Sequence, residues 1–197
     1  EKKRMMDFYH SCLQRHLFAN GGEGKYYLAK NPNFSPMVAT LRKRYPDARF
    51  IYLVRSPLEA VPSHLSLKEQ EWQLLGNPRE PYASREFILE ESEHWYTYPL
   101  QELERMPDDQ YAIVEFECLV GNARETIAEV YDRFGWEMTP IFKKILNVAT
   151  ENARDHESKH EYSLEEMGLS EAELRNRFTS TFDRFNFPEP GMSKGSD

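Results

Sequence analysis

The chain lacks several features that define familiar classes of protein. Its 197 residues include two cysteines, Cys12 and Cys118, which lie far apart and form no C-x-x-C pair. This scarcity excludes a disulfide-stapled scaffold and a zinc site built from thiolates. The longest uninterrupted apolar run, residues 50–54, is far too short to cross a bilayer, so we expect no transmembrane segment.

Two short motifs lack residues that the corresponding sites need. The run Gly-Gly-Glu-Gly-Lys at 21–25 has no upstream glycine at the Walker A spacing, and Tyr26 stands where serine or threonine is required. His156 and His160 are four residues apart but do not form an H-E-x-x-H pattern. The first motif therefore predicts a turn, and we expect no metal at the second.

The residues that are present are those of a globular domain. Hydrophobic residues make up 40% of the chain and aromatic residues 13%, which is too apolar for a disordered protein. We expect one domain over residues 1–187 and a disordered tail over 188–197, a stretch of Pro, Gly, Ser and Lys. The chain begins with Glu1 and shows no signal peptide, which leaves the compartment open and favours the cytoplasm.

The net charge of −8 is unevenly distributed along the chain. Residues 1–68 hold 12 Lys and Arg against 5 Asp and Glu, whereas residues 69–197 hold 13 against 28. The basic part is therefore able to meet a phosphate or a sulfate although the whole chain is acidic. An uneven scatter of solvated surface charge is the alternative.

The hydrophobic pattern predicts an α/β fold. Apolar runs rich in β-branched and aromatic residues predict strands at 26–29, 49–54 and 111–116. Apolar residues at helical spacing predict the helices between them: 3–19, 36–45, 57–75, 84–105, 123–135, 140–149 and a last helix after Ser170. Pro62 predicts a kink or local break in its helix. Alternating strands and helices indicate a parallel sheet, although three strands are few for this length.

The residues that follow each predicted strand are the candidates for chemistry, because ligands of parallel α/β sheets bind at the carboxyl ends of the strands. These residues are Lys30, Arg55 and Glu117. Arg55 is the sharpest signal, since a helix begins two residues later and its N-terminus attracts anions. Ser63, about 9 Å further along that helix at 1.5 Å per residue, lies where it can share a phosphate with Arg55. An ordinary strand-to-helix turn, with Arg55 paired to a surface acid, is the alternative.

Four blocks in order carry a recognisable pattern: Leu-Ala-Lys-Asn-Pro at 28–32, an Arg-x7-Ser element within 45–67, Val-Glu-Phe-Glu-Cys-Leu-Val at 114–120, and His-Glu-Tyr-Ser-Leu-Glu-Glu-Met-Gly-Leu at 160–169. Together they resemble the sulfotransferase family, and most closely a broad group with many bacterial members. The resemblance covers most of residues 26–186. It implies a three-layer, P-loop NTPase-like fold with a central parallel sheet flanked by helices.

The resemblance also implies an activity and a set of site residues. Members transfer a sulfuryl group from 3′-phosphoadenosine-5′-phosphosulfate to a hydroxyl or an amine, without a metal. Carried over, Arg55 and Ser63 hold the 3′-phosphate of this donor, and Lys30 stabilises charge near the transferred sulfuryl group as a catalytic residue. Lys159 and His160 take the place of C-terminal basic residues that approach the donor phosphate. The implied acceptor is a small molecule or a glycan, and no nucleic acid is involved.

The sequence departs from the family pattern in three places. The glycine-rich loop that binds the 5′-phosphosulfate is absent, so we expect an N-terminally truncated domain that holds the C-terminal portion. Residues beside Lys30 include no general base, which leaves His64, Glu69 or a group outside the chain for that role. Phe116 and Cys118 replace the Tyr and Asp of the family's Tyr-Glu-Asp motif.

Two further functions stay open at this point. One is an inactive, sulfotransferase-like binding module. The other is a nucleotide kinase-like phosphotransferase, which needs a Walker A loop and a magnesium-binding carboxylate that the sequence does not show.

Overall fold

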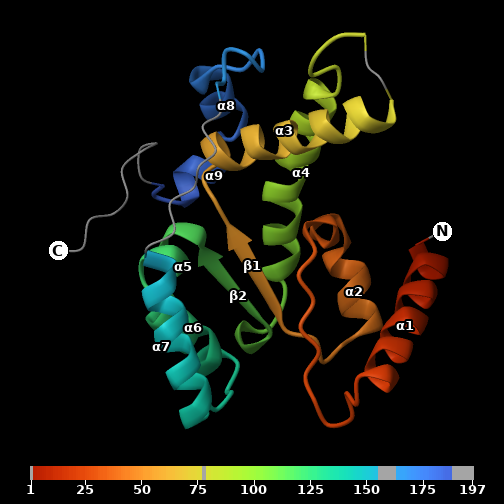
Figure 1. Cartoon of the computed structure of the whole chain (residues 1–197), viewed down its shortest axis with the longest axis vertical. Helices are drawn as coiled ribbons and strands as arrows, with labels where there is room; N and C mark the ends of the chain where they lie inside the picture. The colour runs from red at the N-terminus through yellow and green to blue at the C-terminus, as the bar shows by residue number, and fades with distance from the viewer. Residues whose placement is uncertain (1, 77–78, 155–162, 188–197) are drawn as a thin grey trace.

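The computed structural model describes residues 2–76, 79–154 and 163–187. A parallel two-stranded sheet lies at the centre, formed by β1 (Phe50–Val54) and β2 (Tyr111–Glu115). Phe50 lies opposite Tyr111, and Val54 lies opposite Glu115. Figure 1 shows α4 on one side of this sheet and the group α5 to α7 on the other. The helix-rich α/β fold with a parallel sheet is therefore confirmed.

Helices and short 3₁₀ turns make up most of the remaining described structure. They are α1 (Lys2–Ala19), η1 (Pro32–Met37), α2 (Val38–Arg44), α3 (Pro57–Leu75), α4 (Arg85–Leu103), η2 (Asp108–Gln110), α5 (Phe116–Gly121), α6 (Ala123–Arg133), α7 (Pro140–Arg154), α8 (Glu171–Arg177) and α9 (Thr179–Arg184). The expected helices over 3–19, 57–75, 84–105, 123–135 and 140–149 are all present, some with shifted ends.

The two faces of the sheet are covered unequally. Side chains alternate along a strand, so Tyr52 and Val54 face the main core, which α3 and α4 supply with Leu65 and Leu89. On the opposite face, Ala112 and Val114 of β2 are buried against Val130 and Phe134 of α6. Their register partners on β1, Ile51 and Leu53, are each 45% exposed. Among the described residues, the helical cover on this second face therefore protects β2 and leaves β1 half open.

The predicted strand at 26–29 is wrong. Residues 26–31 have no regular secondary structure, and Tyr26 and Leu28 are 85% and 84% exposed. Ring contacts hold this segment in place of the hydrogen bonds of a sheet. The ring centres of Tyr26 and Trp136 are 5.2 Å apart, and those of Tyr27 and His16 are 5.7 Å apart. An apolar run becomes a strand only where a partner strand accepts its hydrogen bonds. The described sheet consequently has two strands, not three.

The glycine-rich run at 21–25 is a turn, as predicted. Gly21 and Gly24 both adopt positive φ angles, of 58° and 71°. Such angles favour glycine because it has no Cβ atom. No helix follows the run directly, so its geometry is not that of a phosphate loop.

Two helical predictions need correction. The helix expected over 36–45 begins instead as η1 at Pro32, where Asn31 accepts a hydrogen bond from the Asn33 N–H as the N-cap. Pro62 does not break its helix, since α3 is continuous through it. Its neighbours Val61 and Leu65 are almost fully buried. Their packing outweighs the single backbone hydrogen bond that a proline removes.

The C-terminal helices are tied to α4 by arginines. The Arg85 Nη1 atom donates to the Gly168 carbonyl at 2.7 Å and lies 3.3 Å from Glu173 of α8. Arg177 of α8 forms ion pairs with Glu86 and Glu93 of α4. These contacts hold α8 against the helices that frame the carboxyl end of β1. Among the described residues, no helix combines the length and apolar character needed to span a bilayer.

Candidate active site at the carboxyl ends of the strands

The candidate site lies where β1 and β2 end. Arg55 is the first residue after β1, and α3 begins two residues later at Pro57. Phe116 follows β2 directly and opens the short helix α5. Because the strands are parallel, both junctions meet at the same edge of the sheet (Figure 1).

The guanidinium group of Arg55 is held on two sides. Its Nε atom donates to Glu59 Oε2 at 2.7 Å, one helical turn further along the chain. Its Cζ atom lies 4.7 Å from the centre of the Phe116 ring, a cation–π contact that joins the two strand ends. The side chain is still 36% exposed, and its terminal Nη atoms form no hydrogen bond with the described residues. Arg55 thus pairs with an acid, as expected for an ordinary strand-to-helix turn. Its Nη atoms nevertheless remain available to donate to a ligand.

A buried tyrosine fixes the backbone of Arg55. The Tyr96 hydroxyl, on α4, donates to the Arg55 carbonyl at 2.7 Å. Burial raises the pKa of Tyr96 far above its ordinary value, and the Arg55 cation only partly opposes this. The Tyr52 hydroxyl donates to the Trp95 carbonyl at 2.9 Å, and burial raises its pKa as well. Both hydroxyls therefore remain protonated donors at neutral pH.

Ser63 lies on α3, the helix that begins two residues after Arg55, as the sequence predicts, and is half-buried. The helix begins without a side-chain cap, because the Ser56 hydroxyl makes no capping hydrogen bond. Pro57 has no N–H group, so the first available N–H of α3 is that of Leu58. The positive end of this 19-residue helix therefore lies beside the Arg55 guanidinium.

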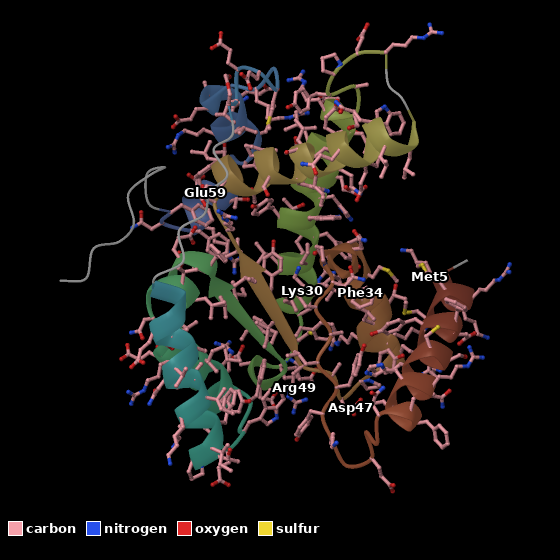
Figure 2. All side chains as sticks on the ribbon, in the orientation of Figure 1. Met5, Lys30, Phe34, Asp47, Arg49 and Glu59 are labelled. Carbon is pink, nitrogen blue, oxygen red and sulfur yellow. The ribbon has the colours of Figure 1, made fainter. Side chains whose placement is uncertain are left out.

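Lys30 is in a different position from the one predicted. It was expected at the end of a strand, but it lies exposed on the irregular segment before η1. Figure 2 shows Lys30 on this segment near the labelled Phe34, while Glu59, the partner of Arg55, lies at the start of α3. Lys30 forms no hydrogen bond or ion pair with any described residue. The described contacts therefore join Arg55, Glu59 and Phe116, and do not include Lys30.

Lys159 and His160, the other predicted phosphate contacts, lie outside the described residues.

The two candidate bases differ sharply in their surroundings. Glu69 is 6% exposed, and its carboxylate accepts hydrogen bonds from the Tyr82 N–H at 2.9 Å and from Gln73 at 2.7 Å. These bonds make Glu69 an anchor for the loop that follows α3. His64 stacks on Trp95, with ring centres 5.0 Å apart and planes at 18°. Its Nε2 atom lies 3.7 Å from Glu91 Oε2.

Sequence reasoning missed three residues that shape this site: Glu59, Phe116 as the ring beneath Arg55, and Tyr96. The i,i+4 spacing of Arg55, just before α3, and Glu59, in its first turn, was the available signal for their ion pair. Tyr96 carried no such signal, because it is 41 residues away from the carbonyl it contacts. The described residues contain no group of His, Cys, Asp or Glu side chains able to hold a metal ion.

Comparison with known proteins identifies the family. A model of the sulfotransferase family matches residues 2–140, which is more than half of the chain. The chain belongs to the sulfotransferase family. A search of curated proteins found no match.

Two solved structures share the fold of this sulfotransferase family member. The sulfotransferase STF9 from Mycobacterium avium superimposes with a TM-score of 0.73 at 19% identity, over 85% of this chain and 44% of that one. The sulfotransferase domain from the curacin biosynthetic pathway superimposes with a TM-score of 0.54 at 13% identity, over 91% of this chain and 68% of that one. The chain therefore spans less than half the length of STF9. The fold that these two structures share with the chain therefore agrees with the family that the family model identifies.

Proposed function

We propose that this chain binds 3′-phosphoadenosine-5′-phosphosulfate and transfers its sulfuryl group to a hydroxyl or amine of a small molecule or glycan, without a metal. The observation that carries the proposal is the fixed guanidinium of Arg55 at the start of α3. Arg55 and Ser63 would hold the 3′-phosphate of the donor.

The surroundings of Arg55 suit a phosphate for three reasons. Glu59 and the Phe116 ring hold the guanidinium in one orientation, which lowers the entropy lost when it binds a ligand. Its planar fork of donors matches a phosphate in a bidentate manner. The N-terminus of α3 adds the backbone N–H group of Leu58 and a positive partial charge, because the N–H groups of Glu59 and Ala60 already donate to the Ser56 carbonyl.

Lys30 would stabilise negative charge on the donor and would not orient it. As an exposed cation without a described partner, it is free to approach the bridging oxygen that becomes negative when the sulfuryl group leaves. Lys159 and His160 remain proposed donor contacts from the C-terminal part of the chain.

Binding of adenosine 3′,5′-bisphosphate, measured by isothermal titration calorimetry, tests the phosphate site. Charge-assisted hydrogen bonds contribute about 1.5–3 kcal/mol. We therefore expect Arg55→Ala to weaken binding by roughly 10- to 150-fold. Arg55→Lys should recover only part of this loss, because an ammonium group cannot reproduce the bidentate fork.

Arg133→Ala is the matched control. Arg133 also stacks on an aromatic ring, with its Cζ atom 5.2 Å from the centre of Tyr111, and its Nε donates to a backbone carbonyl. Tyr111 begins β2, so this arginine lies at the opposite end of the sheet. Binding to Arg133→Ala should equal that of the wild-type chain. Equal affinities of Arg55→Ala and the wild-type chain, or no binding to either, would refute the phosphate site.

Transfer assays separate an enzyme from a binding module and from a kinase. With the phosphosulfate donor, the wild-type chain should release adenosine 3′,5′-bisphosphate in an acceptor-dependent manner and in the presence of EDTA. Binding of the bisphosphate without transfer to any hydroxyl or amine would support the inactive binding module. Magnesium-dependent turnover of ATP would support the phosphotransferase instead.

A further inference from the structure

The proposed transfer needs a group that accepts the proton of the acceptor, and no such group lies beside Lys30 in the sequence. Resting on the proposed function, we infer that His64 is this general base and that Glu91 is the residue that positions its ring. His64 follows Ser63 directly on α3, and Glu91 and Trp95 lie on α4.

The imidazole ring of His64 is held in one plane and one direction. It stacks nearly parallel on the Trp95 indole, with 18° between the planes. Its Nε2 atom faces the Glu91 carboxylate at 3.7 Å, which favours the tautomer with the proton on Nε2. Neither ring nitrogen forms a hydrogen bond with a described residue. Nδ1 therefore keeps its lone pair for an incoming proton.

The electrostatic environment keeps this ring neutral near pH 7. Burial is the main influence and lowers the pKa of His64 below the ordinary value of 6.5. The facing charges act in both directions: Lys68 on α3 lowers the pKa further, while Glu71 on α3 and Glu91 on α4 raise it. A neutral imidazole accepts a proton, whereas a charged one does not.

The other described histidines lack this combination. His94 stacks on Tyr98 but is exposed, and it faces no carboxylate of a described residue within ion-pair distance. His10 lies 3.2 Å from the Tyr45 hydroxyl, and His16 packs against Tyr27, both on α1. Among the four described histidines, His64 alone adjoins the proposed phosphate-binding serine.

The proposed step balances without a further reactant. The acceptor oxygen forms a bond to sulfur while the bond between sulfur and the bridging oxygen of the donor breaks. The electron pair of that bond leaves with the bridging oxygen, where Lys30 is proposed to offset the charge. The proton of the acceptor hydroxyl passes to Nδ1 of His64. Glu91 stabilises the imidazolium that results.

Two acceptors of different acidity test the assignment. Phenol, with a pKa of about 10, needs a base near pH 7.5, whereas 4-nitrophenol is largely ionised there. We expect His64→Ala to lower kcat/KM with phenol by roughly 10²-fold or more and with 4-nitrophenol by less than about threefold. Added imidazole should restore part of the phenol activity of His64→Ala, because the deleted ring leaves space beside Trp95.

Controls distinguish a base from a structural residue. His94→Ala removes a histidine that also stacks on an aromatic ring, and it should leave both rates unchanged. Glu91→Gln should shift the acidic limb of the pH–rate profile to lower pH, because the carboxylate it removes raises the pKa of His64. If His64 only packs against Trp95, His64→Ala should not affect phenol more than 4-nitrophenol, and Glu91→Gln should not shift the pH–rate profile.

The outcomes separate this inference from the proposed function. Three results would overturn the base assignment: equal losses with both phenols, full activity of His64→Ala, or transfer by the wild-type chain to neither phenol. The proposed phosphate site would still stand in each case if the chain binds the bisphosphate. If the wild-type chain does not bind the bisphosphate, the proposed function is wrong, and so is the base assignment that rests on it.

Discussion

The hydrogen bond from Tyr96 to the Arg55 carbonyl should contribute to the free energy of unfolding in a way that depends on pH. Tyr96→Phe removes a hydroxyl that donates at 2.7 Å from within the core, and it leaves a carbonyl without a described partner. An unpaired buried acceptor costs about 1–3 kcal/mol. We therefore expect Tyr96→Phe to lower the free energy of unfolding by about 2 kcal/mol at pH 7, or to lower the Tm by roughly 4–8 °C.

The same substitution should matter less in alkali. The pKa of Tyr96 is raised in the folded state from its ordinary value of 10.0, mainly by burial. A group with a raised folded pKa stabilises the protein fully below its unfolded pKa and loses this contribution as the pH rises above it. At pH 11 the unfolded wild-type chain gains about 1.4 kcal/mol by ionising Tyr96, and Tyr96→Phe does not. The difference in stability between the two should therefore shrink from about 2 to about 0.6 kcal/mol.

Urea denaturation followed by circular dichroism at pH 7, 9, 10 and 11 measures this difference. Tyr98→Phe is the matched control, because Tyr98 lies half-buried on the same helix and its hydroxyl makes no hydrogen bond with a described residue. Its effect should stay below about 0.5 kcal/mol at neutral pH. A stability difference for Tyr96→Phe that stays constant up to pH 11 would refute the shielding of its hydroxyl. A difference near zero at pH 7 would refute the hydrogen bond.

Two further substitutions test the packing that supports the site. Leu65→Ala, at a fully buried position of α3, should lower the free energy of unfolding by about 2–5 kcal/mol; Leu74→Ala, 83% exposed on the same helix, should change it by less than about 0.5 kcal/mol in the same urea titration. Ser170→Ala should cost about 1 kcal/mol, because the hydroxyl accepts the Glu173 N–H at the start of α8. Ser84→Ala should cost less in thermal unfolding, since Ser84 occupies the N-cap of α4 without a capping hydrogen bond; equal costs for the two serines would contradict the capping geometry.

Local patterns in the sequence were sufficient for much of the fold. The apolar run at 50–54 is β-branched and aromatic, and it forms β1. Leu58, Val61 and Leu65 repeat at helical spacing, and they are buried along α3. These elements are predictable because the same side chains that set the pattern also make the core contacts.

Local patterns failed where an element depends on a distant partner. The apolar run that contains Tyr26 and Leu28 predicts a buried strand, yet both residues are exposed because no hydrogen-bonded strand of the described structure lies beside them. Pro62 reads as a helix break, yet burial of its neighbours holds α3 together. In both cases the outcome depends on what packs around the segment, which a window of sequence does not contain.

Neighbouring residues along the chain are enough to place Arg55 directly after a strand, and to place Ser63 on the helix that begins two residues after Arg55. Tertiary packing alone places Phe116 beneath the Arg55 guanidinium, the Tyr96 hydroxyl at the Arg55 carbonyl, and His64 against Trp95 and Glu91. These partners come from α5 and α4, and only the pairing of the strands and the packing of α3 on α4 bring them into contact with Arg55 and His64.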